Sequence, residues 1–137
     1  MKAYQIKSKA FHGTDYEEVY PQAAAVFKRI KNKNPRRQPN VRSPHFSNSK
    51  IFIGTFWQHL NQKSNPDRIR RLKFFGCGIE LIRNSRFEPT TKKNPNKPNF
   101  LMHRFAGVTA DKELFYVQIQ ENTKTGKRYL MSAFPEQ

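Results

Sequence analysis

His103 and Arg104 are neighbours near the start of a stretch rich in aromatic and β-branched residues that runs from Phe100 to the C-terminus. A histidine ionises near neutral pH and can take or give a proton, and the planar guanidinium of an arginine binds phosphate through paired hydrogen bonds. Cleavage of an RNA chain by its own 2′-OH needs a base, an acid, and cations or hydroxyls around the phosphorus. We therefore predict a catalytic site in which His103 is base or acid and Arg104 binds the scissile phosphate. Thr109 and Ser132 would hydrogen-bond phosphate or base.

Three consecutive strands must position these side chains. The runs FLMHRFAGVT, ELFYVQIQEN and KRYLMSAF have the aromatic and β-branched composition of strands, and the turn sequences TADK and TKTG separate them. In the middle run, Phe115, Val117 and Ile119 alternate with polar residues and are predicted to be the buried set.

The length of the first turn decides which face carries His103. A shift of one residue moves every side chain of a strand to the opposite face of the sheet. An even number of loop residues would place His103 with Tyr116 and Gln118, and an odd number would swap the two sets. We expect the even loop, and therefore a partly polar surface on which His103 stands beside Tyr116 and Gln118.

The net charge of +16 and the pI near 10.3 indicate a polyanionic partner. RNA is the partner we expect. A membrane is not expected, because the sequence has no apolar stretch of about 18 residues and no evident basic amphipathic helix. The basic and aromatic side chains predicted to contact RNA outside the catalytic site are Arg36, Arg37, Arg70, Arg71, Lys92, Lys93, Tyr116 and Tyr129.

No cofactor or metal is expected. Walker, GxGxxG, HExxH and GxSxG motifs are missing from the sequence, and the carboxylates are scattered. A zinc site built from His45, His59 and His103 has no ligand spacing to support it. His59 is interpreted as a half-buried helix residue that could still face a groove. The single cysteine, Cys77, is predicted to be a small buried side chain, which fits a cytoplasmic protein, and the N-terminus lacks the apolar core of a signal peptide.

The chain is expected to form one α+β domain over residues 1–137, with an N-terminal helix and basic arm (1–44) and a core (45–137). Helices are predicted after Thr14 with a turn before Pro21, over residues 55–63, and from Asn65 with a break near the sequence FFGCG. A strand is predicted at residues 50–54. The Pro-rich stretches 32–44 and 87–99 are interpreted as basic loops. The helices should pack on a C-terminal antiparallel sheet made of the three strands and one or two more.

Three segments of this pattern are similar to a known superfamily. They are HRFAGVT from His103, LFYVQI from Leu114 and YLMSAFP from Tyr129, preceded by IFI, FWQHL, Arg70-Arg71 and ELI. Together they resemble the phage-type nucleases of the barnase, EndoU, colicin and RelE-like (BECR) superfamily over residues 45–135. The resemblance implies a small α+β ribonuclease of toxin or phage origin that needs no metal, and His103 and Ser132 match its pattern best. It also implies an acidic antitoxin or immunity protein as a partner.

A non-catalytic module is the main alternative function. In that case Tyr116, Phe105 and Tyr129 would stack exposed bases of RNA or DNA while the basic loops follow the phosphates. A structural component of a ribonucleoprotein is a third alternative, in which the charge serves assembly alone.

Overall fold

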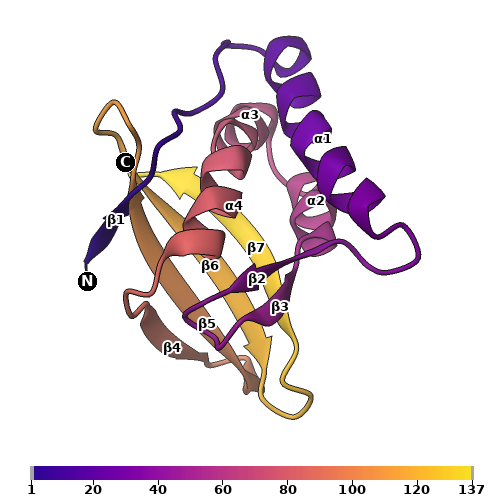
Figure 1. Cartoon of the computed structure of the whole chain (residues 1–137), viewed down its shortest axis with the longest axis vertical. Coiled ribbons are helices and arrows are strands. Elements are labelled where there is room, and N and C mark those ends of the chain that lie inside the picture. The colour runs from indigo at the N-terminus through magenta and orange to yellow at the C-terminus, as the bar shows by residue number, and fades with distance from the viewer. Residues whose placement is uncertain (1, 137) are drawn as a thin grey trace.

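The computed structural model describes residues 2–136, and this part of the chain forms helices packed against one curled sheet (Figure 1). The helices are α1 (Tyr16–Lys33), α2 (Gly54–Leu60), α3 (Asn65–Lys73) and α4 (Phe75–Asn84). The strands are β1 (Ala3–Gln5), β2 (Asn40–Ser43), β3 (Ser49–Phe52), β4 (Thr90–Asn94), β5 (Lys97–Val108), β6 (Leu114–Asn122) and β7 (Arg128–Pro135). The predicted α+β class is confirmed. None of the helices in this part of the chain is long and apolar enough to cross a membrane.

The sheet is mixed, with strand order β1-β5-β6-β7-β3-β2 and with β4 also paired to β5. Strand β6 pairs antiparallel with β5 on one side and with β7 on the other, as the turn sequences predicted. However, β1 runs parallel to β5 and β3 runs parallel to β7. The prediction of a wholly antiparallel sheet is therefore wrong, because long connections through helices allow strands distant in sequence to pair in parallel.

Helix α4 packs on one face of the sheet, which we call the buried face (Figure 1). Phe115, Val117 and Ile119 of β6 are fully buried there, as predicted. A Cβ atom added to Gly78 of α4 would lie 3.2 Å from the Cβ of Ala133 and 3.3 Å from a methyl of Val117, so this glycine lets helix and sheet approach closely. Cys77 is buried beside it, and burial raises the pKa of its thiol to about 12.

Helix α1 is one continuous helix, and the predicted short turn before Pro21 is not found. Asp15, rather than Thr14, caps it by accepting a hydrogen bond of 2.9 Å from the backbone N–H of Glu18. Pro21 lies one turn into the helix, where it costs a single backbone hydrogen bond. The break near FFGCG is confirmed, because α3 ends and α4 begins at Phe74.

Strands β2 and β4 lie inside the two stretches that were interpreted as loops. The prediction was wrong because the Pro, Asn and Lys content of these stretches is typical of loops, while partner strands decide their conformation. In β2, Val41 is buried opposite Ile51 of β3. Strand β4 is mostly exposed and pairs antiparallel with β5, with which it forms a hairpin.

The turn between β5 and β6 has an odd number of residues, 109–113, so the expected face of His103 is wrong. In the observed register, His103 is opposite Ile119 and Phe105 is opposite Val117 on the buried face. The turn is closed at Glu113, whose backbone N–H donates to the Thr109 hydroxyl and whose carbonyl accepts from the Thr109 N–H, and Lys112 adopts a positive φ of 71°. An even loop would also have placed the charged Arg104 next to Val117 in the core.

Candidate nucleic-acid interface

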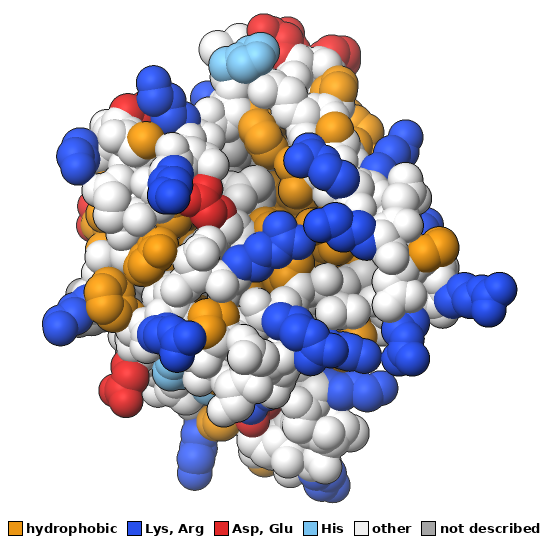
Figure 2. Space-filling model, viewed as in Figure 1, with side chains coloured by type: hydrophobic (Ala, Val, Ile, Leu, Met, Phe, Trp, Pro, Cys, Tyr) orange, Lys and Arg blue, Asp and Glu red, His pale blue; other side chains and the backbone are white. Residues whose placement is uncertain are grey.

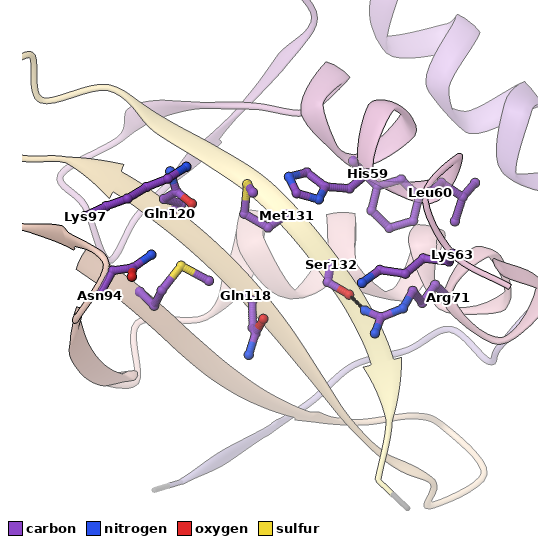
Figure 3. Close-up of a pocket in the computed structure, with 12 residues that line it drawn as sticks. His59, Leu60, Lys63, Arg71, Asn94, Lys97, Gln118, Gln120, Met131 and Ser132 are labelled. Atoms are coloured by element: carbon purple, nitrogen blue, oxygen red, sulfur yellow. Dashed lines mark hydrogen bonds between the residues drawn. The ribbon is translucent and has the colours of Figure 1, made fainter. Parts of the chain in front are cut away.

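The second face of the sheet, which we call the outer face, carries a groove between two raised banks (Figure 3). Its floor comes from β5, β6 and β7, one bank comes from α2, α3 and the segment between them, and the β4–β5 hairpin forms the other. The cavity measures about 340 Å³, within the range of about 300–1,000 Å³ that is usual for ligand sites. The lining residues are Phe56, His59, Leu60, Lys63, Arg71, Asn94, Lys97, Met102, Gln118, Gln120, Met131 and Ser132.

Cations line both banks of the groove, and no Asp or Glu is among its lining residues within the described chain. Lys63 and Arg71 project from the helical bank, and Lys97 projects from the hairpin (Figure 3). A smaller hollow of about 140 Å³ adjoins the groove at Met102 and Gln118, and its other lining residues are Thr90, Lys92, His103 and Arg104. The two hollows together form a basic surface suited to a chain of phosphates.

Arg71 is held in place at the edge of the floor. Its Nη1 donates a hydrogen bond to the Ser132 hydroxyl (Figure 3), and its Nη2 lies 3.9 Å from a carboxylate oxygen of Asp67. Its guanidinium also lies 5.4 Å from the centre of the Phe134 ring. The Nε of Arg71 is buried and has no hydrogen-bond partner among the described residues, so any anion must be bound by the two terminal nitrogens of the guanidinium.

His59 comes from α2 and points into the groove from the helical bank (Figure 3). Partial burial lowers the pKa of His59 below its ordinary 6.5, and the positive charges of Lys63, Lys97 and Arg71 lower this pKa further. The imidazole is therefore neutral at pH 7 and can accept a proton. A neutral base among cations is the arrangement that proton abstraction next to a phosphate requires.

The outer face continues beyond the groove as a cluster of aromatic rings and guanidinium groups. The exposed Arg104 guanidinium lies 5.6 Å from the ring centres of both Tyr116 and Phe134. The rings of Tyr116 and Phe134 lie 5.9 Å apart. Tyr129 is opposite Gln120 in the register and packs at 5.8 Å on Phe52. The residues predicted to stack bases thus lie on the outer face, except Phe105, which is buried.

His103 lies in a separate polar cluster on the buried face, which corrects its predicted position. Its Nδ1 and the Thr91 hydroxyl are 2.8 Å apart, and its Nε2 lies 2.9 Å from a carboxylate oxygen of Glu121. The same oxygen accepts a hydrogen bond of 3.0 Å from Arg128. The Phe46 ring covers the imidazole at 5.0 Å, and Arg128 lies 4.2 Å above that ring. Both imidazole nitrogens therefore have partners within the protein.

The other predicted catalytic residues are spread over the sheet. Ser132 lies in the groove beside Arg71, and Arg104 lines the adjoining hollow. Thr109 is fully buried in the β5–β6 turn, where its hydroxyl donates to Asp111 at 2.6 Å. The structure therefore brings Ser132 and Arg104 to the outer face and leaves Thr109 in the turn. His103 lines the small hollow as well, but its imidazole is held by Thr91 and Glu121 in the polar cluster.

The predicted RNA-contacting cations also separate. Arg71 and Lys92 line the two hollows of the outer face, whereas Arg70 forms an ion pair of 2.6 Å with Asp67. Arg37 lines a different recess at the end of α1. Arg36 and Lys93 are exposed and line none of these hollows.

Sequence reasoning missed His59, Lys63 and Lys97 as parts of one site. His59 precedes Lys63 by one helical turn, and this spacing is a signal that could have paired the two residues across the end of α2. Lys97 gave no such signal, because only the pairing of β4 with β5 brings it to the groove.

Comparison of the chain with protein-family models, with curated proteins and with solved structures found no match.

Proposed function

We propose that this protein binds single-stranded RNA in the outer-face groove and cleaves it by attack of a ribose 2′-OH on the adjacent phosphate. The observation that carries the proposal is the position of His59, a neutral base placed beside Lys63 and Arg71 in a groove without carboxylates. A deprotonated base and a phosphate-binding cation in the same cavity are the two parts that such a reaction needs most.

Phosphate recognition is assigned to Arg71, Lys63 and Lys97. Arg71 is fixed by Ser132 and by the Phe134 ring, so its guanidinium loses little freedom when it binds a phosphate. Lys63 and Lys97 face each other across the groove and bind the phosphates on either side. Affinity would fall steeply with salt, because each neutralised phosphate releases a counterion.

The reaction follows from these positions. His59 accepts the proton of the 2′-OH, and the 2′-oxygen forms a bond to phosphorus while the bond from phosphorus to the 5′-oxygen breaks. Arg71 stabilises the charge of the phosphorane, and the Lys63 ammonium gives a proton to the leaving 5′-oxygen. The products are a 2′,3′-cyclic phosphate and a 5′-OH, so protons and bonds balance without a further reactant. The cations of the groove supply the charge stabilisation that a metal ion supplies in other nucleases.

A single strand fits this groove better than a duplex. Gln118 and Gln120 present amides on the floor, and Met102 and Met131 present apolar surface between them. An unpaired base can place its flat face on the thioethers and its edge against the amides, whereas a base in a duplex exposes neither.

A non-catalytic binding module is the second candidate, and one observation favours it. Arg104 lies over both Tyr116 and Phe134, so the outer face already carries a stacked aromatic and guanidinium surface of the kind that binds bases without cleaving them. This surface and the groove are compatible, and only the chemistry of His59 separates the two functions.

The resemblance to the BECR nucleases belongs to the same proposal, as does the packing of helices on the antiparallel strands β5, β6 and β7. In that setting the protein is a toxin or phage-related effector, and an acidic antitoxin or immunity protein would neutralise it by covering the groove.

Incubation of the purified protein with RNA in EDTA tests the proposal. We expect cleavage with 2′,3′-cyclic phosphate ends, and we expect His59→Gln to abolish cleavage while binding of a non-cleavable 2′-O-methyl RNA persists. A Lys124→Gln variant, altered in the β6–β7 turn outside every hollow described above, serves as the control. Binding without cleavage by the wild-type protein would contradict the enzyme and leave the binding module.

A further inference from the structure

A second basic recess lies between the C-terminal ends of α1 and α4 and the β2–β3 hairpin. It encloses about 450 Å³ and shares no residue with the groove. Figure 2 shows the face of the molecule that carries α4 and this hairpin, and Lys and Arg side chains lie across its middle. The cations that line the recess are Lys33, Arg37, Arg42, Lys50 and Arg83.

The like charges of Arg42 and Lys50 face each other directly across the β2–β3 pair. Such a pair is unfavourable for folding, because like charges directly opposite each other destabilise a sheet. No Asp or Glu of the described chain lies within ion-pairing distance of either residue. Arg42 Nη1 donates a hydrogen bond of 2.8 Å to the Asn48 carbonyl, which holds the guanidinium in place but does not neutralise its charge. The two uncompensated charges point to an anion that binds there.

Helix ends account for only part of the charge. Lys33 and Arg83 lie in the last turns of α1 and α4, where basic side chains offset the helix dipole. Arg42 and Lys50 lie on strands, so this explanation does not apply to them. The recess therefore gathers cations from four separate elements around one cavity.

The lining of the recess favours a phosphodiester backbone over an acidic protein. Three of the five cations are arginines, whose guanidinium groups bind phosphate oxygens in pairs. Asn34, Gln38 and Asn40 add uncharged amides that can bind phosphate or sugar oxygens. No aromatic side chain lines the recess, whereas protein interfaces are anchored by such side chains in their centre.

We infer that this recess is a second nucleic-acid site, which holds the phosphate backbone of a strand segment other than the one in the groove. The groove lies on the outer face of the sheet, whereas α4, which contributes Arg83 to the recess, packs on the buried face. One molecule can therefore hold two segments at once and bridge them. This inference requires no cleavage, so it stands or falls separately from the chemistry of His59.

Stoichiometric titration with a short 2′-O-methyl oligonucleotide tests the inference. The oligonucleotide has about six nucleotides, within the usual size of a single-strand site of about 4–16 nucleotides. We expect two to bind to the wild-type protein and one to bind to the Arg42→Gln, Lys50→Gln double variant. The matched control, Lys124→Gln with Lys127→Gln in the β6–β7 turn, removes the same charge and should still bind two.

The double variant removes a repulsion and also the hydrogen bond from Arg42 to the Asn48 carbonyl, so urea denaturation of both proteins checks that the variant is fully folded under the titration conditions. A double variant that binds as many oligonucleotides as the wild-type protein would overturn the inference. A stoichiometry of one for the wild type that falls to zero in the double variant would instead keep the recess and contradict binding in the groove. Equal competition for the recess by polyglutamate and by RNA of the same charge would also overturn the inference, in favour of an acidic protein surface.

Discussion

His59 and His103 lie on opposite faces of the sheet in opposite electrostatic surroundings. His59 projects into a groove lined by Lys63, Arg71 and Lys97, where neighbouring positive charges and partial burial favour its neutral form. His103 is buried and contacts Thr91 and Glu121. The comparison shows that the partners of a histidine, and not its position in a motif, decide whether it can serve as a base or holds strands together.

The two sites also differ in how their charges are balanced. Around His103, the carboxylate of Glu121 meets both the imidazole and Arg128, so the cluster is satisfied within the protein. Around His59, the cations of the groove lack carboxylate partners apart from the distant contact of Arg71 with Asp67. The first arrangement stabilises the fold, and the second favours an external anion.

The largest effect is expected from Arg71→Ala. Loss of a fixed donor to a transition-state charge costs about 10²–10³ in rate, so RNA cleavage should fall by that factor. Arg71→Lys keeps the charge but loses the planar fork, and it should recover only part of the activity. Single-turnover cleavage rates measure both variants, with Lys124→Ala as the control for charge. If Arg71→Ala were as active as this control, Arg71 would have no role in the reaction.

The His103→Gln variant should lower stability rather than activity. The shorter amide cannot contact Thr91 and Glu121 together, and one unsatisfied buried group costs about 1–3 kcal/mol. Urea denaturation measures this loss, and His59→Gln provides the matched comparison with an expected change within about 0.5 kcal/mol. If His103→Gln abolished cleavage while leaving stability unchanged, the roles of the two histidines would be reversed.

The Lys63→Gln variant should move the acid limb of the pH–rate profile to higher pH. His59 has a lowered pKa in the folded protein, so it is deprotonated and active above that pKa and loses activity as the pH falls through it. Removal of the Lys63 charge removes one cause of the lowering, and the pKa should rise towards 6.5. The pH dependence of kcat/KM and an NMR titration of the His59 ring both report the shift. A shift to lower pH would contradict the assignment of His59 as the base.

The smallest effect is expected from Thr109→Val. The Thr109 hydroxyl holds the β5–β6 turn through Glu113, and its loss should cost about 1 kcal/mol of stability. Cleavage should stay at the wild-type rate, because Thr109 is buried in the turn and lines neither hollow of the outer face. A loss of activity that exceeds the loss of folded protein would restore the original prediction of a catalytic Thr109.

The sequence predicted which segments form helices and strands better than it predicted which face of the sheet each side chain occupies. Alternation in β6 identified Phe115, Val117 and Ile119 as core residues, because only an amphipathic strand has that period. The face of His103 depended on whether Glu113 belongs to the turn or to the strand, and the contact of Thr109 with Glu113, made by both the hydroxyl and the backbone, closes the turn there. Local composition could not reveal that contact.

The groove was beyond prediction for a related reason. Ser132 and Arg71 were each proposed to contact RNA, yet nothing in the sequence showed that they meet. Lys97 reaches the same groove because β4 pairs with β5, and β4 was interpreted as a loop. The total charge predicted a polyanion, whereas the location of its site required the tertiary structure.

Chemical-shift mapping with a short 2′-O-methyl RNA shows where the strand binds on the protein, and it does so without requiring cleavage. If the outer-face groove is the RNA site, the amides of Gln118, Gln120 and Ser132 and the ring of His59 should shift together at low RNA concentration. The ring of His103 should stay unchanged at the same concentration. Chemical-shift changes confined to residues outside the groove would contradict the placement of the RNA in it.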